Sequence, residues 1–160
     1  KMNKQFILSF LLVIVVACQQ EANCQQNTKN TLNHKSIDLE TDTIFNGLVE
    51  IRRDIHENPE LAGKEISTQK VIKQYLLDLG LEVETGIYGH GIIGILKGDK
   101  EGRKIAWRAE MDALPNDFPD KVDFKSKVKG VQHGCGHDIH MAIALGIAQV
   151  LAKNKKSLHK

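Results

Sequence analysis

Three stretches of the chain carry apolar residues every three or four positions, which is the spacing of one face of a helix. They predict helices at residues 41–56, 63–79 and 139–151. Pro59 lies just beyond the first stretch and Gly80 just beyond the second, and proline and glycine commonly end helices at such places. The helical pattern therefore divides the chain after residue 40 into segments of ordinary length for a small domain.

Short apolar runs between the second and third helices predict strands at residues 81–85, 92–96 and 104–109, with glycines separating them. Helices that alternate with strands indicate an α/β fold, in which we expect the helices to pack on a mixed sheet. Charged residues follow the third predicted strand, at the kind of edge where α/β proteins usually build their sites.

The N-terminal pattern differs from the rest. An apolar run over residues 6–17 follows Lys4 and is short for a bilayer span, which is the layout of a secretory signal peptide. The run ends in Val15-Val16-Ala17-Cys18, which resembles the bacterial lipobox, so we expect a lipid on Cys18. Simple cleavage that releases a soluble secreted protein, and an uncleaved anchor, are the alternatives.

These patterns predict three parts: a signal peptide at 1–17, a flexible polar tether at 18–36, and a folded portion at 37–160. The expected location is the periplasm, or the outer membrane through the lipid anchor. Of 22 basic residues Lys1 and Lys4 precede the apolar run, which leaves 20 basic against 20 acidic residues. The sequence has no stripe of basic residues with aromatic residues between them, so we expect no nucleic-acid partner. We expect contact with a membrane only through the lipid.

Candidate chemistry is densest at residues 130–140, directly before the last predicted helix. Cys135 and His137 carry a thiol and an imidazole, the side chains that bind zinc best, and the glycines beside them let the backbone turn both toward one point. A helix that begins at about Asp138 would also favour the thiolate. The stretch predicts half of a metal site, and the alternative is an ordinary glycine-rich loop before a helix.

Two further groups of polar residues accompany this loop. Asp112 follows the third predicted strand, where its carboxylate would orient a metal ligand or tune a catalytic base; a salt bridge with Arg108 is the alternative. His56 would lie at the C-terminus of the first helix and Glu65 in the first turn of the second. Taken alone, His56 and Glu65 would be structural.

Together the three groups resemble one family. Arg-Arg-x-x-His-x-x-Pro-Glu-Leu, Arg-Ala-Glu-Met-Asp-Ala-Leu-Pro and His-Gly-Cys-Gly-His-Asp-x-His occur in the order found in metal-dependent amidohydrolases. These enzymes include hippurate hydrolase, indole-acetyl-amino-acid hydrolases and N-acetyldiaminopimelate deacetylase, a branch of the dinuclear zinc exopeptidase superfamily. The resemblance spans about residues 39–151. It implies that Cys135 and His137 are metal ligands and that Asp112 is the catalytic carboxylate that supports them. It gives supporting roles to His56, Glu65, Asp138 and His140.

The resemblance implies hydrolysis of the amide bond of N-acyl amino acids, or of related peptide-like conjugates, with two divalent ions, zinc or manganese, in the complete enzyme. It also allows a homodimer of the full-length protein. In the family, further glutamate and histidine ligands and a lid domain lie downstream, so we expect this chain to be an N-terminal portion that is inactive alone. Two alternatives come from other classes: a non-catalytic lipoprotein that binds a metal or ligand, and a thiol hydrolase with Cys135 as nucleophile.

Overall fold

The computed structural model describes residues 34–99 and 101–158. The predicted signal peptide, the lipidation site Cys18 and most of the predicted tether lie outside the described residues. Within the described ranges, no helix combines the length and the apolar character that a membrane crossing requires.

The first described helix, α2, spans His34–Glu57 and ends directly before Asn58-Pro59, as predicted. It begins earlier than the sequence suggests, so residues 34–36 of the predicted tether are helical. Contacts with the far end of the chain account for the extra turns. Glu40 accepts a hydrogen bond from Asn154 at 2.9 Å and forms an ion pair with Lys153 at 3.1 Å.

The second helix, α3, spans Ile66–Asp78, slightly shorter than predicted. Glu60 accepts hydrogen bonds from the backbone N–H groups of Ser67 and Thr68, at 3.0 and 2.8 Å. These N–H groups have no acceptor within the helix, so Glu60 satisfies them in the manner of a capping residue. At the other end Gly80 adopts a φ of +78°, the left-handed conformation expected there.

A hairpin follows α3. Strands β1 (Glu82–Ile87) and β2 (Gly91–Ile95) pair antiparallel and make up the sheet of the described residues. The third predicted strand, 104–109, is not formed, and its residues Ile105 and Trp107 are 96% and 64% exposed. A strand requires a partner for its backbone hydrogen bonds, and residues 104–109 do not pair with either edge of the β1–β2 sheet. The strand prediction at 104–109 was therefore wrong for the chain as described.

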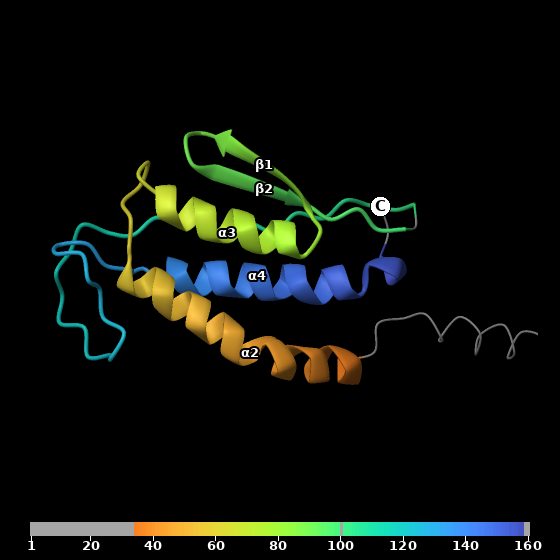
Figure 1. Ribbon diagram of the computed structural model, residues 1–160, viewed down its shortest axis with the longest axis horizontal. Helices are drawn as coiled ribbons and strands as arrows, with labels where there is room; N and C mark the ends of the chain where they lie inside the picture. Colours follow the sequence, from red (N-terminus) through yellow and green to blue (C-terminus); the bar gives the residue numbers. More distant parts are fainter. Residues whose placement is uncertain (1–33, 100, 159–160) are drawn as a thin grey trace, which may run out of the picture. The chain divides into compact units, whose positions relative to one another are not determined.

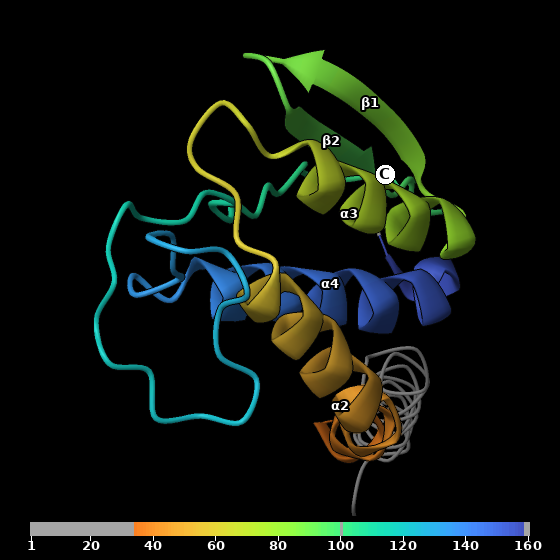
Figure 2. The same cartoon turned by 60° about the vertical axis from the view of Figure 1, so that its left-hand side comes forward.

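The last helix, α4, spans His137–Lys153 and leads into a short 3₁₀ helix, η2 (Lys155–Ser157). In both views α4 lies between α2 and α3, and the hairpin covers α3 on the side away from α4 (Figures 1 and 2). A side chain at Gly146 would place its Cβ 2.8 Å from Leu48 Cδ1, so glycine allows α2 and α4 to pack closely.

The core lies where these layers meet. Its buried members come from α2, α3, α4 and the residue before β1: Ile55, Ile72, Leu76, Leu81, Met141 and Leu145. The predicted α/β class is confirmed, with helices packed beside a small sheet. Packing against this core fixes the starts and ends of α2 and α4, which carry the polar residues of the candidate site.

Candidate metal centre

The glycine-rich loop turns sharply before α4. Gly136 adopts a φ of +83°, which a residue with a side chain rarely adopts, and its N–H group donates to the carbonyl oxygen of His133 at 3.2 Å. Cys135 precedes this turn and His137 follows it as the first residue of α4. The loop thus presents the two predicted metal ligands on either side of one glycine.

Both predicted ligands face Asp112. His137 Nδ1 lies 2.9 Å from the main-chain oxygen of Asp112 and 3.1 Å from its carboxylate Oδ1. Cys135 Sγ lies 3.8 Å from the same main-chain oxygen. Because both oxygens are acceptors, His137 Nδ1 donates to them, and in the neutral ring the free lone pair is then on Nε2. Asp112 therefore favours the tautomer that leaves Nε2 open to a metal, and its predicted supporting role stays a prediction.

Glu110 and His140 lie beside this pair. His140 Nδ1 is 3.1 Å from Glu110 Oε2, and the rings of His137 and His140 are tilted with centroids 5.5 Å apart. Glu110 also forms a salt bridge with Arg108 at 3.3 Å. The alternative given for Asp112 was a salt bridge with Arg108, and in the structure Arg108 pairs with Glu110 instead. The pKa of Glu110 is lowered by its own backbone N–H group and then by His140. Its carboxylate is therefore ionised near neutral pH and available as a ligand.

The residues present suit a divalent metal. One ligand atom each from Glu110, His137 and His140 lies within 4.8 Å of the other two, close enough to share an ion. Cys135 is not part of that group, and its sulfur lies beside the main-chain oxygen of Asp112 that His137 also contacts. Two imidazoles and a carboxylate form a donor set that zinc binds and that other transition metals accept. Sequence reasoning gave no ligand role to Glu110.

Asp138 is buried at the start of α4 and binds two residues of α2. Its Oδ2 accepts from Arg52 Nε at 2.7 Å and lies 2.9 Å from His56 Nδ1. Burial alone would raise the pKa of Asp138, but the bonds from His56 and Arg52 bring it below the ordinary value. The carboxylate is thus charged and joins the end of α2 to the first turn of α4. The structure thus brings His56 and Asp138 together, and their supporting roles stay predictions.

His133 is the least expected member of the site. It is only 3% exposed, and neither ring nitrogen has a hydrogen-bond partner among the described residues. Burial lowers its pKa to about 4, against the opposing charge of Asp138. His133 is therefore a neutral imidazole at neutral pH, packed beside His56 with ring centroids 6.3 Å apart.

Glu65 does not join this group. It stands at the N-cap position of α3, where its side chain makes no capping hydrogen bond. Sequence reasoning also missed Asp120, whose Oδ2 lies 2.9 Å from His56 Nε2, and Phe124, whose ring packs against His56. No short-range signal marks these two, because 64 or more residues separate each from its partner in the sequence.

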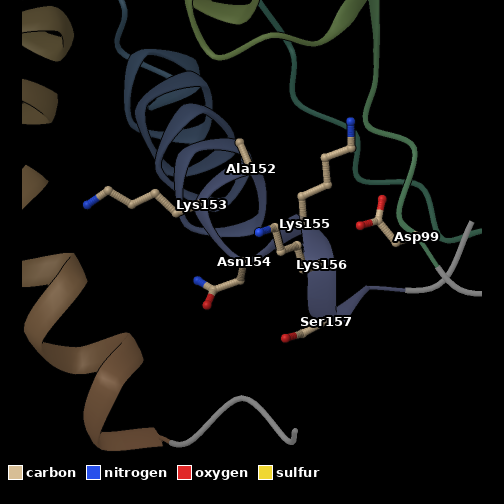
Figure 3. A pocket seen from close by; sticks show the side chains of 7 residues that line it. All are labelled: Asp99, Ala152, Lys153, Asn154, Lys155, Lys156 and Ser157. Atoms are coloured by element: carbon tan, nitrogen blue, oxygen red, sulfur yellow. The ribbon is translucent and has the colours of Figure 1, made fainter.

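A surface hollow of about 540 Å³ lies at the other end of α4 (Figure 3). Its lining includes Asp99, Lys153, Lys155 and Lys156. Because α4 has 17 residues and an α-helix rises about 1.5 Å per residue, this hollow is roughly 25 Å from the first turn of the helix. The hollow is therefore separate from the residues around Asp112.

Comparisons with known proteins agree with these motifs. Residues 106–160 match the model of peptidase family M20/M25/M40. Thermostable carboxypeptidase 2 of Saccharolobus solfataricus is 52% identical over 109 residues, which cover 68% of this chain and 28% of that protein. N-acetyl-L-cysteine deacetylase of Bacillus subtilis is 38% identical over 128 residues, 80% of this chain and 31% of that protein.

A solved structure gives the same picture. The Bacillus subtilis YXEP protein, described as a dinuclear metal binding peptidase from the M20 family, superposes with a TM-score of 0.68 and 37% identity. The match covers 71% of this chain and 32% of that one. The chain thus spans about a third or less of the length of these relatives. The resemblance predicted from the three motifs is confirmed, and in sequence and fold this chain is a relative of the M20/M25/M40 peptidases.

Proposed function

We propose that this chain contributes the metal-binding loop of an enzyme that hydrolyses the amide bond of N-acyl amino acids or related peptide-like conjugates. The relatives support this substrate class through their names, which include a carboxypeptidase and an N-acetyl-L-cysteine deacetylase. Both of those names describe cleavage of an amide next to an amino acid. The proposal concerns the activity of a whole enzyme, and the matched region makes up about a third or less of each relative.

One observation carries the proposal. Cys135 and His137, on either side of Gly136, both contact Asp112 from a distant part of the chain. A carboxylate that fixes the tautomer of a metal-binding histidine is a recurring arrangement in hydrolytic metal sites. A glycine-rich loop that only connects a strand to a helix does not require a thiol and an imidazole to meet at the same backbone oxygen.

Two divalent ions, zinc or manganese, would supply a Lewis acid that polarises the scissile carbonyl and makes water more acidic. The chain's own residues prepare for such ions. Asp112 accepts the hydrogen bond of His137 Nδ1, which in the neutral ring directs the lone pair to Nε2 for binding. Cys135 and His137 would be the first ligands, with Glu110 and His140 as the further donors nearest to them. Asp138 would hold the first turn of α4 in place through Arg52 and His56.

The test is hydrolysis by the full-length protein. Purified protein would be stripped with a chelator, reloaded with Zn²⁺ or Mn²⁺, and assayed for amine release from N-acetyl and N-benzoyl amino acids. We expect activity that disappears with the chelator and returns with either ion. No turnover of either substrate series by the metal-loaded protein would contradict the proposal.

A second treatment of the same sample distinguishes a thiol mechanism from the metal-dependent one. If Cys135 were a nucleophile, iodoacetamide would inactivate the enzyme and a chelator would have no effect. We expect the chelator to inactivate, and the metal to protect Cys135 from alkylation, since a bound thiolate reacts slowly with electrophiles.

We also propose that the protein is exported and attached to a membrane through a lipid on Cys18. The lipobox-like end of the apolar run supports this assignment. Mass spectrometry of the mature N-terminus is the test, with a diacylglyceryl-modified cysteine as the expected result. An unmodified Cys18 thiol would contradict it.

A homodimer of the full-length protein is a further expectation from the family, and sedimentation equilibrium would measure it.

A further inference from the structure

The loop between residues 116 and 129 is fastened to the C-terminal end of α2 at three points. Asp120 reaches His56, Phe124 packs on the side chains of α2, and the N–H group of Lys127 donates to the carbonyl oxygen of Glu57 at 2.8 Å. Lys127 and Glu57 also form an ion pair through their side chains. Both views show this loop beside the end of α2 and the start of α4 (Figures 1 and 2).

His56 is held between two carboxylates. Its Nδ1 lies 2.9 Å from Asp138 Oδ2, and its Nε2 lies 2.9 Å from Asp120 Oδ2. The side chain of His56 is 11% exposed, that of Asp120 is 20% exposed and that of Asp138 is 1% exposed, so water competes weakly for these bonds. Because both nitrogens are engaged, the ring cannot turn without losing a bond at each side.

Phe124 also contacts Arg52, the second residue that binds the carboxylate of Asp138. Its ring meets His56 edge-on with centroids 5.3 Å apart, and the guanidinium carbons of Arg52 and Arg53 lie 4.9 and 5.0 Å from its centroid. Such cation–π contacts hold an arginine in a defined direction. Arg52 in turn donates to Asp138 at 2.7 Å. Phe124 thus contacts both residues that bind the Asp138 carboxylate.

We propose that Asp120 and Phe124 are positioning residues for the metal centre. They hold His56 and Arg52 against Asp138, and Asp138 is the neighbour of His137 in the first turn of α4. The position of the loop is thereby transmitted to the imidazole that binds the metal. The inference rests on the proposed function in that the ion is the ligand being positioned, and it adds two residues that contact neither the ion nor the substrate.

Cobalt binding tests this inference with a readout other than activity. Co²⁺ bound to a thiolate and an imidazole gives visible bands whose energies report the ligand geometry. The full-length protein would be titrated with Co²⁺ as wild type, Asp120→Asn and Phe124→Leu. Matched controls come from the same loop: Asp117→Asn changes an exposed aspartate, and Phe118→Leu changes a phenylalanine that is 70% exposed.

We expect Asp120→Asn and Phe124→Leu to weaken cobalt binding about tenfold, the lower end of the effect of removing a partner of a metal ligand, and to shift the visible bands. The control variants should match the wild type. Asp120→Glu, which keeps a carboxylate, should restore much of the affinity. Variants that bind cobalt with wild-type affinity and bands would overturn the inference, while hydrolysis by the wild type would still support the proposed function.

The metal-free protein provides an independent measurement. In ¹⁵N-histidine spectra, the Nδ1 and Nε2 signals of His137 report its tautomer and surroundings without any ion. We expect these signals to shift or broaden in Asp120→Asn and to stay unchanged in Asp117→Asn. Unchanged His137 signals in Asp120→Asn, with circular dichroism showing a folded protein, would mean that the loop only stabilises the fold.

Discussion

His137 Nδ1 lies 3.1 Å from the carboxylate of Asp112 and 2.9 Å from its main-chain oxygen, across 25 positions of sequence. This double contact leaves a single nitrogen of the imidazole available as a ligand. The geometry therefore links the loop that we propose to bind metal to a residue on another segment of the chain. Asp112 belongs to an extended segment that forms an isolated bridge at Ala113 with Leu61.

Replacement of Asp112 by asparagine should weaken binding of the metal about tenfold, because the charge that favours a proton on His137 Nδ1 is lost. The main-chain oxygen still accepts from that nitrogen, so the loss should stay near the lower end of the usual range. Isothermal titration with Zn²⁺ measures it. Asp117→Asn is the control, and equal affinities of the two variants would show that Asp112 plays no part in binding.

Replacement of Asp138 by asparagine should lower the free energy of unfolding of the metal-free protein by about 2–3 kcal/mol, since the buried partner of Arg52 and His56 loses its charge. The partial exposure of Arg52 keeps the figure below that of a fully buried pair. Urea denaturation provides the measurement. Asp54→Asn, at an exposed position of α2, should change stability by less than about 0.5 kcal/mol. Similar midpoints for the two variants would argue against this role.

Glu60 should make the stability depend on pH in the acid range. Burial would raise its pKa, but hydrogen bonds from the backbone of Thr68 and Ser67 bring it below the ordinary 4.5. A carboxylate with a lowered pKa stabilises the fold above its unfolded pKa, and the benefit is lost as the pH falls through the folded value. Glu60→Gln should therefore cost about 1 kcal/mol at pH 7 and progressively less below 4.5.

The control for Glu60→Gln is Glu65→Gln. It also removes one negative charge, five residues further along the chain, but the side chain of Glu65 makes no capping hydrogen bond. Thermal melts of both variants and the wild type, between neutral and acid pH, give the comparison. A constant difference between wild type and Glu60→Gln across this range would contradict the assignment.

The sequence predicted the helices well because each has a local signature. Apolar spacing located all three, and Pro59 and Gly80 marked two of the ends. The starts of α2 and α3 were misplaced, because side-chain contacts outside the apolar pattern accompany them. Glu40 with Asn154 extends α2, and the side chain of Glu60 caps α3. The predicted strand at 104–109 failed for a related reason, since strand pairing is decided by partners outside the strand.

The candidate site divides in the same way. Residue types and spacing in two motifs singled out Cys135, His137 and Asp112, and the structure brings these three together. Asp120 and Phe124 could not, because nothing near them in the sequence indicates that they contact His56. Glu110 is recognisable in the sequence as a charged residue. Its contact with His140 could not be predicted, because it depends on how the segment before Asp112 packs against α4.

The most direct measurement of the central claim is bound metal and amide hydrolysis in Cys135→Ser of the full-length protein. A hydroxyl is a far weaker ligand than a thiolate for zinc, so we expect bound metal to fall and hydrolysis of N-acyl amino acids to decrease with it. His34→Ala, at the distant end of α2, should leave both unchanged. Wild-type metal content and hydrolysis in Cys135→Ser would contradict the account.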